Sequence, residues 1–213
     1  SFTIDSALAG ALGTVTLMFR LVGGTAAGTA ADRWGRKLPL VLSITWFSLF
    51  TVLSGFSTSY AMLFACRALF GIGMGGEWAA GMPLALEHLP DRMRGPAAGI
   101  LQGAWAWGYI LSALVFQTLY PVLHERSEDA WRVMFWVGAV PALLVLWIRA
   151  RVSESPVWLK RQREGPGGGQ RVSLARIFGR DLLGTTIHCS LLAAGFMVSY
   201  YSVTYWYATF LQN

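Results

Sequence analysis

Six long segments of this chain consist almost entirely of apolar residues, and short polar stretches separate them. The segments are residues 7–31, 38–56, 60–86, 96–119, 133–148 and 182–211. A helix of about 20 apolar residues crosses the ~30 Å hydrocarbon core of a bilayer, so each segment is a candidate membrane span. The shortest segment gains length from Trp131 and the arginines at its ends, which suit the membrane interface. The pattern therefore predicts an all-α membrane protein with six transmembrane helices.

The composition of the chain supports the same class. Charged residues make up 13% of the chain and apolar residues 54%, whereas about 25% of the residues in a soluble domain are charged. A soluble bundle would also carry one charged face on each helix. The two cysteines, Cys66 and Cys189, form no ligand spacing. We therefore expect no metal site, no cofactor and no enzymatic centre.

Basic residues gather on one side of the predicted membrane. The loops after the first, third and fifth spans hold thirteen Lys and Arg residues, and the loops on the other side hold two. Because cytoplasmic loops carry the excess of positive charge, we expect the basic loops in the cytoplasm and the spans in a plasma (inner) membrane. The net charge of +6 then reflects topology, and no nucleic-acid partner is expected.

One long polar stretch divides the chain unevenly. Residues 149–181 include the run GPGGG at 165–169, which is typical of a flexible link rather than a helix. We expect residues 1–148 to form one helical half and residues 149–181 to form a cytoplasmic loop. Residues 182–213 then form the first helix of a second half.

Motifs at the ends of the predicted helices resemble those of the major facilitator superfamily. The turn after the first span resembles the family signature G-x-x-x-D-R-x-G-R-K at Gly28, Asp32, Arg33, Gly35, Arg36 and Lys37. Arg67 and Glu87 begin stretches similar to R-x-x-x-G-x-G and E-x-x-P-x-x-x-R-G, and residues 153–159 resemble P-E-S-P-x-W-L. The resemblance implies that residues 1–148 hold helices two to six and residues 182–213 hold helix seven. It also implies that helix one and helices eight to twelve are missing.

Two further runs narrow the resemblance to particular branches. Residues 19–24, FRLVGG, are similar to a run of metabolite:proton symporters, and residues 75–78, GGEW, look more like sialate and lactate proton symporters. This implies alternating-access, proton-coupled uptake of a small organic anion, either a monocarboxylate or a sialate-like acid. A proton-coupled sugar or polyol transporter and a non-transporting membrane receptor or scaffold stay open. The expected partners are the substrate, protons, the lipid bilayer and the remaining helices.

Ionisable side chains within the spans are the first candidates for binding and coupling. Such groups are costly in hydrocarbon and normally face a cavity or a partner. Arg67 is a candidate for attracting the anion, Glu77 is a candidate proton carrier, and Arg20 is a third candidate. Each also has a structural alternative, which is a fixed bond inside the bundle.

Polar and aromatic residues on two helix faces are further candidates for lining a cavity. Gln102, Trp105 and Tyr109 share one face of the fourth predicted helix, and Tyr200 and Thr204 share a face of the last. Aromatic residues also concentrate in interfacial belts, so belt or packing roles stay open. Glycines one turn apart, such as Gly71 and Gly75, predict close helix packing.

Charges of alternating sign occupy the predicted cytoplasmic helix ends. The resemblance implies a salt-bridge lock that holds one access state, formed by Asp32, Arg33, Gly35, Arg36, Glu87, Arg94 and Glu154. The alternative is a solvated fringe of charges in which each pair contributes less than ~1 kcal/mol.

Overall fold

The structure is a computed structural model that describes residues 5–125, 129–164 and 178–211. These residues form helices and no strand, which confirms the all-α prediction. They divide into two compact units, Ser1–Arg163 and Glu164–Asn213, each of which is described by itself. The predicted link at 165–169 lies outside the described residues.

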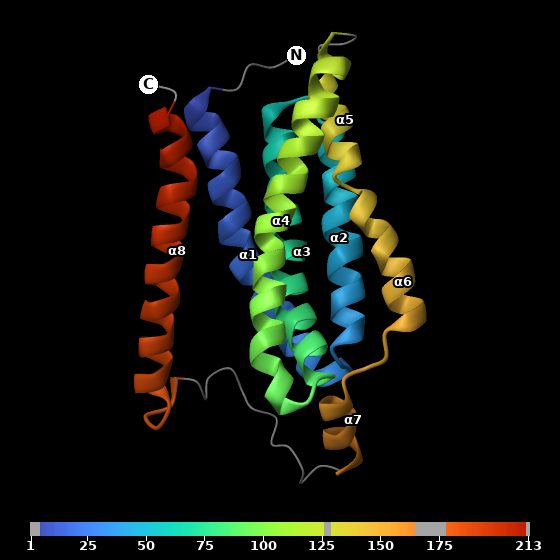
Figure 1. Ribbon diagram of the computed structural model, residues 1–213, viewed down its shortest axis with the longest axis vertical. Coiled ribbons are helices and arrows are strands. Elements are labelled where there is room, and N and C mark those ends of the chain that lie inside the picture. Colours follow the sequence, from blue (N-terminus) through green and yellow to red (C-terminus); the bar gives the residue numbers. More distant parts are fainter. Residues whose placement is uncertain (1–4, 126–128, 165–177, 212–213) are drawn as a thin grey trace. The chain divides into compact units, whose positions relative to one another are not determined.

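Four long helices make up most of the first unit (Figure 1): α1 (Ser6–Trp34), α2 (Lys37–Gly55), α3 (Tyr60–Glu87) and α4 (Asp91–His124). Two of them begin at side-chain caps, as their sequences favour. Asp5 accepts a hydrogen bond from the Leu8 amide at 2.8 Å, and Ser59 accepts one from the Met62 amide at 3.2 Å. The described part of the second unit is mainly α8 (Leu183–Leu211).

Four of the described helices are long and apolar enough to cross a membrane. They are Ala7–Trp34, Lys37–Gly55, Asp91–His124 and Leu183–Val203. The 28-residue α3 is long enough, but Arg67, Glu77 and its glycines lower its mean hydropathy. The sequence predicted six membrane spans. Four of the described helices have the length and the apolar composition that a membrane span needs.

The segment predicted as the fifth span is helical, but it is not one helix. It consists of α5 (Ala130–Val137), a 3-10 turn at Val140–Ala142 and α6 (Leu143–Arg151). Pro141 has no amide hydrogen to donate to the carbonyl of Val137, so the α-helical hydrogen bonding stops there. The amide of Ala142 instead donates to the carbonyl of Ala139 at 2.8 Å.

Glycines on α3 allow its backbone to touch both neighbouring helices. A methyl group at Gly75 would overlap the carbonyl oxygen of Arg20 on α1. A methyl group at Gly73 would come within 2.7 Å of the amide nitrogen of Phe47 on α2. From the α1 side, a methyl group at Gly24 would be in contact with the Gly75 carbonyl at 3.4 Å. The prediction of close packing at the glycines is confirmed.

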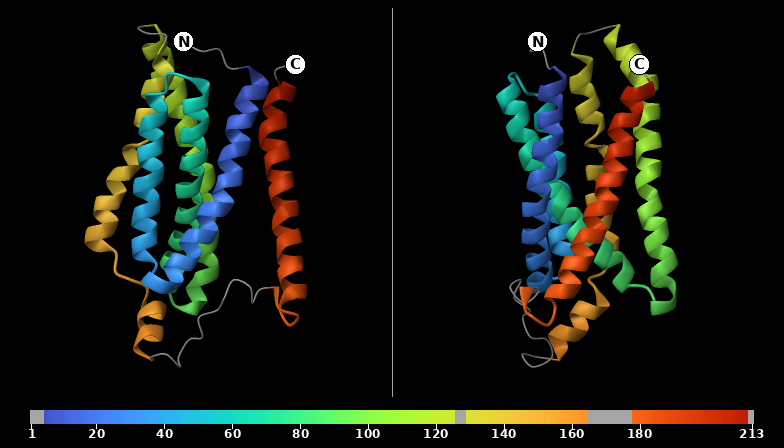
Figure 2. Two further views of the ribbon diagram at one scale, coloured as in Figure 1. Left: turned by 180° about the vertical axis from the view of Figure 1, so that it is seen from behind. Right: turned by 90° about the vertical axis from the view of Figure 1, so that its left-hand side faces the viewer.

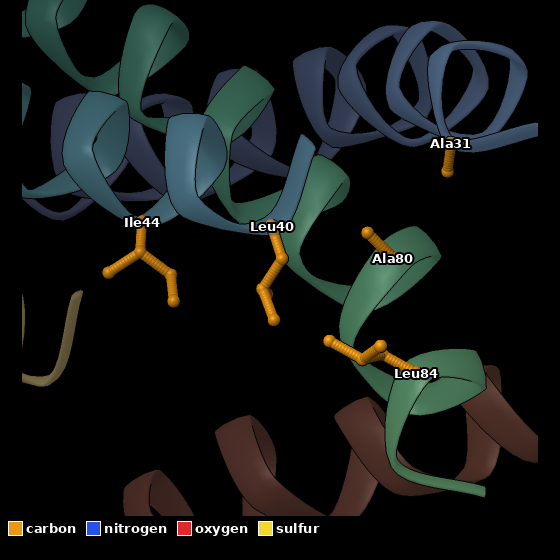
Figure 3. Close-up of a cluster of buried hydrophobic side chains, with 5 residues drawn as sticks. All are labelled: Ala31, Leu40, Ile44, Ala80 and Leu84. Carbon is orange, nitrogen blue, oxygen red and sulfur yellow. The ribbon is translucent and has the colours of Figure 1, made fainter. Parts of the chain in front are cut away.

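A small apolar core lies between α1, α2 and α3, toward the end of the bundle where α1 ends. Figure 3 shows side chains from the three helices directed into this space, and they are Ala31, Leu40, Ile44, Ala80 and Leu84. The short helix α7 (Pro156–Arg163) lies at this same end of the first unit (Figure 1, Figure 2). The core therefore supports the helix ends at which the predicted lock residues lie.

Candidate functional site

Arg20, near the middle of α1, lies against aromatic rings from two other helices. Its guanidinium carbon is 5.5 Å from the ring centroid of Trp78 on α3 and 5.4 Å from that of Trp105 on α4. The two indoles meet edge to face at 5.8 Å, and Tyr109 lies 6.1 Å beyond Trp105. Cation–π contacts of this kind hold a guanidinium without using its N–H donors. We call Arg20, Glu77, Trp78, Trp105 and Tyr109 the Arg20 site.

Glu77 supplies the negative charge of this site. Its carboxylate interacts electrostatically with Arg20 and lies next to Gly81, where an added methyl group would be 3.3 Å from Oε1. Within the described residues, the Glu77 side chain forms no hydrogen bond and no ion pair within 4.0 Å. The two charges are therefore neighbours without being bonded to each other.

The Arg20 site lies deep within the helices rather than at their ends. At 1.5 Å per residue, Arg20 is about 21 Å from the end of α1, and Glu77 is about 15 Å from the end of α3. Trp105 is about 21 Å from the start of α4. These depths correspond to the middle of a ~30 Å hydrocarbon layer, where transporters of several folds bind their substrates.

Arg67 occupies a different environment, although it lies on the same helix as Glu77. Its Nη2 donates to Ser54 Oγ on α2 at 2.9 Å. Its guanidinium carbon lies 4.3 Å from the ring centroid of Phe70 and 4.8 Å from that of Phe135 on α5. Arg67 therefore joins α2, α3 and α5, and the structure does not bring it into the Arg20 site.

A second group of charges lies where α1 ends and α2 begins. Arg36 Nη1 is 2.9 Å from Asp32 Oδ1, and its Nη2 is 3.6 Å from Glu87 Oε1 at the end of α3. The side chain of Arg36 is 14% exposed and that of Glu87 is 20% exposed, so solvent screens this pair only partly. Asp32, Arg36, Glu87, Glu154 and Ser155 are called the charge cluster below.

Glu154 reaches this cluster from a distant part of the chain and caps α2. Its Oε1 accepts from the amides of Arg36 at 2.8 Å and Lys37 at 3.3 Å, and its Oε2 lies 3.2 Å from the latter amide nitrogen. A carboxylate at a helix N-terminus satisfies amides that have no partner within the helix and complements the helix dipole. Gly35 makes this possible because its φ of 94° is rarely open to other residues, and a side chain there would overlap Glu154.

Ser155 connects the cluster to α7. Its hydroxyl donates to Glu87 Oε2 and accepts from the Trp158 amide at 3.1 Å, which is N-cap geometry. Pro156 follows as the first helical residue, where its missing amide hydrogen costs nothing. The Trp158 indole donates to the Asp32 carbonyl oxygen at 3.2 Å. The cluster thus ties α1, α2, α3 and α7 together.

Comparison with known proteins places the chain in a family. Residues 1–213 match the family profile described as Major Facilitator Superfamily. A relative from Cupriavidus pinatubonensis, named a probable 4-methylmuconolactone transporter, is 41% identical over 99% of this chain and 48% of its own length. The chain belongs to the major facilitator superfamily. It spans about half the length of the curated relatives that it matches.

Two more comparisons agree with this membership. A sialic acid transporter of Escherichia coli is 36% identical over 70% of this chain and 35% of its own length. A partially occluded, inward open structure of the E. coli xylose transporter matches the fold with a TM-score of 0.64 at 23% identity, over 90% of this chain and 50% of that chain. Major facilitator proteins are integral membrane transporters rather than enzymes, which agrees with the sequence-based expectations.

The major facilitator fold brings only some of the predicted site residues together. Arg20, Glu77, Trp105 and Tyr109 meet in one site, and Gln102 is exposed one turn away on α4. Tyr200 belongs to the second unit, where its ring stacks on Phe196 at 6.4 Å. The side chain of Thr204 lies outside the described part of the chain.

The predicted lock residues divide in the same way. Asp32, Arg36, Glu87 and Glu154 share the charge cluster, and Gly35 leaves room for it. Arg94 Nη1 instead lies 2.6 Å from Asp91 Oδ1, and its Nε donates to the carbonyl oxygens of Leu86, in the last turn of α3, and Leu89, in the turn that follows. Arg33 is exposed at the end of α1.

Sequence reasoning did not select Trp78 and Ser155 as functional residues. Trp78 is adjacent to an embedded carboxylate, and an aromatic ring beside an intramembrane charge is a signal that could have identified it. Ser155 precedes Pro156, and Ser-Pro at the start of a helix is a capping signal. In both cases the partner, Arg20 or Glu87, comes from a distant helix, and local sequence does not reveal it.

Proposed function

We propose that this chain is part of a secondary active transporter that takes up a small organic anion together with protons. The observation that carries the proposal is Arg20, a cation at mid-depth held by two indole faces, with Glu77 beside it. A guanidinium recognises a carboxylate through two parallel N–H donors. The names of relatives, which include a sialic acid transporter, support an acidic substrate.

Alternating access in this proposal uses the charge cluster as a lock. Asp32, Arg36, Glu87 and Glu154 join helix ends through ion pairs and amide bonds, so the cluster favours one arrangement of those ends. Breaking the bonds to Glu87 and Glu154, together with the bond from Trp158 to the Asp32 carbonyl, would free α3 and α7 from the α1–α2 turn. Interfaces that switch between two bonded arrangements are a common basis for such transitions.

The proposed orientation places the charge cluster and residues 149–181 in the cytoplasm, with the spans in the inner membrane. The support is the excess of Lys and Arg in the loops on that side. Single cysteines introduced at Gln162 and at Thr58 distinguish the two sides in intact cells. An impermeant maleimide is expected to label Thr58→Cys and to spare Gln162→Cys until the cells are opened, and the reverse pattern contradicts the orientation.

Uptake by the complete protein in vesicles tests the transport proposal. We expect an inward proton gradient to drive accumulation of labelled sialic acid or 4-methylmuconolactone, and an uncoupler to abolish it. Xylose, a neutral sugar without a carboxylate, is the comparison substrate. Proton-driven uptake of xylose without uptake of either acid would favour a sugar transporter, and no uptake or exchange of any of them would favour a receptor or scaffold.

A further inference from the structure

We infer that Arg20 and Glu77 form one charge-balancing pair, in which the transported carboxylate and the Glu77 carboxylate compete for the same guanidinium. Each negative charge that binds would then enter with one proton on Glu77. This inference rests on the proposed function and specifies its coupling. It assigns the anion to Arg20 on α1 rather than to Arg67.

The first support is the way in which Arg20 is held. Its guanidinium lies on the faces of Trp78 and Trp105. In the described part of the chain it forms no hydrogen bond or ion pair, although a guanidinium has five N–H donors. Aromatic faces therefore fix the position of the cation and leave its donors ready for a ligand. A carboxylate is the ligand that matches a guanidinium in charge and geometry.

The second support is the position of Glu77. Among the described helices, it is the only Asp or Glu that lies away from a helix end. Its carboxylate senses the charge of Arg20 without forming an ion pair with it. On its other side, α2 presents Leu40 near Gly81 and no charged side chain after Lys37. On α4, which also packs on α3, the charged and titratable residues Asp91, Arg92, Arg94 and His124 lie at the helix ends. Arg20 is thus the charged group that faces Glu77 from these described helices.

The third support is the rigidity of the contact between α1 and α3. The carbonyl oxygen of Arg20 lies against Gly75, two residues before Glu77, and a methyl group there would overlap it. Gly24 lies against the Gly75 carbonyl one turn further along α1. Because the two backbones touch, the separation of the two charges depends on their side chains and not on helix spacing.

Charge balance then couples the proton to the anion. With the site empty, Arg20 and ionised Glu77 sum to zero. Binding of a monocarboxylate beside ionised Glu77 would leave a net negative charge in a medium of low dielectric constant, which is unfavourable. Protonation of Glu77 restores neutrality, and the coupling is reciprocal, since a bound anion also favours the proton. Both leave on the other side, so a monocarboxylate is carried without net charge.

The anion-binding role fits Arg67 less well. Its Nη2 is already bonded to Ser54, and its guanidinium is packed against Phe70 and Phe135. No described carboxylate pairs with Arg67, and Glu77 is about 15 Å away along α3. A cation bonded into three helices in this way stabilises their packing.

The test compares wild type with Glu77→Gln in the complete protein, reconstituted in vesicles. In wild type we expect the apparent affinity for sialic acid to fall with rising pH, by up to about tenfold per pH unit. Transport should not respond to a membrane potential set with potassium and valinomycin. In Glu77→Gln, affinity should lose its pH dependence, and sialic acid exchange should continue. Accumulation driven by the proton gradient should be lost, and net uptake should now respond to the potential.

Two further variants keep the test decisive. Glu125→Gln removes an exposed carboxylate at the far end of α4 and should behave as wild type. Glu77→Asp keeps a titratable group and should keep coupling, which guards against a folding defect in Glu77→Gln. Proton-driven accumulation by Glu77→Gln, or affinity with the pH dependence of wild type, would overturn the inference. Absence of exchange in wild type as well would instead overturn the proposed transport function.

Discussion

The charge cluster and the Arg20 site use the same kinds of side chain, but they differ in how completely those side chains are bonded. In the cluster, the Glu154 carboxylate accepts from the amides of Arg36, Lys37 and Ser155. In the Arg20 site, the guanidinium lies on ring faces, and the carboxylate beside it forms no ion pair with any residue that the structure describes. In the first region the carboxylate is bonded to three amides of the protein, and in the second the N–H donors of Arg20 are left for a ligand.

This difference indicates different tasks for the two regions. A buried polar group that has all its partners holds helices in place, and its loss leaves those partners unsatisfied. A charged group that is positioned without acceptors can bind a ligand with little rearrangement. We therefore expect changes in the charge cluster to affect stability, and changes in the Arg20 site to affect binding and coupling.

The largest effect on stability is expected from Gly35→Ala. Its φ of 94° is a strained conformation for alanine and costs about 1–3 kcal/mol. The added methyl group would also displace Glu154, whose charge-assisted bonds contribute about 1.5–3 kcal/mol. Thermal unfolding of the complete protein in detergent should show a clear fall in the midpoint. Gly103→Ala, whose methyl group would have no atom within 4 Å, should show none, and equal midpoints would contradict this account of the turn.

Glu154→Gln should lower the free energy of unfolding by about 2 kcal/mol, because an amide is a weaker acceptor at a helix N-terminus than a carboxylate. The matching change in the other region, Glu77→Gln, should leave the unfolding midpoint almost unchanged. Chemical denaturation of both variants in the same detergent provides the comparison. If Glu77→Gln proves the more destabilising of the two, the contrast between a bonded and an unbonded region is wrong.

Substitution of the two embedded arginines should show the same contrast, with a loss of stability at Arg67 and a loss of binding at Arg20, each of about 1 kcal/mol. Arg67→Lys loses the Nη2 bond to Ser54 and the planar packing on Phe70 and Phe135, so stability should fall by about 1 kcal/mol. Arg20→Lys keeps the charge but not the fork of donors. Its affinity for sialic acid should fall about tenfold, with a smaller change in unfolding. Unfolding and equilibrium-binding measurements on both variants test this prediction. A larger loss of affinity in Arg67→Lys than in Arg20→Lys would place the anion site at Arg67.

The smallest effect is expected from Asp32→Asn. The Asp32 side chain is 64% exposed, so its pair with Arg36 is screened and contributes less than ~0.5 kcal/mol to stability. The difference between variant and wild type should vanish at high salt. A larger effect, persisting in salt, would show that this end of the cluster is as tightly bonded as the end at Glu154.

The positions of the helices were largely predictable from the sequence. The predicted segment 60–86 corresponds to α3 (Tyr60–Glu87), and the predicted segment 38–56 corresponds to α2 (Lys37–Gly55). The agreement is close because the change from apolar to polar residues marks where a helix leaves the hydrocarbon layer. The fourth helix extends beyond 96–119 to Asp91–His124, since polar residues continue a helix outside the apolar layer. The break at Pro141 was missed because an apolar run does not show how its backbone is bonded.

It was harder to predict from the sequence which of the site residues lie together. Sequence favoured Arg67 as the anion-binding residue over Arg20. In the structure, however, Arg20 interacts electrostatically with Glu77 and lies on the ring of Trp78, the residue next to it. The deciding contact is with Trp105, which lies 85 residues later in the chain. Helical periodicity shows which residues share a face, but it does not show which helix that face meets. For the charge cluster, the resemblance to the family signature identified residues that would lie together. Composition alone would have predicted only a fringe of solvated charges at the helix ends.

The cap on α2 has a consequence for biosynthesis. The first amides of this helix receive their acceptor from Glu154, 118 residues after Arg36. At a synthesis rate of ~5–20 residues per second, the amides wait about 6–24 s for that carboxylate to be made. During this interval water or an insertion factor must satisfy the start of α2. The bond to Glu154 therefore forms only after the helices between Arg36 and Glu154 have been synthesised, which makes the capping of α2 a late step in the assembly of this end of the bundle.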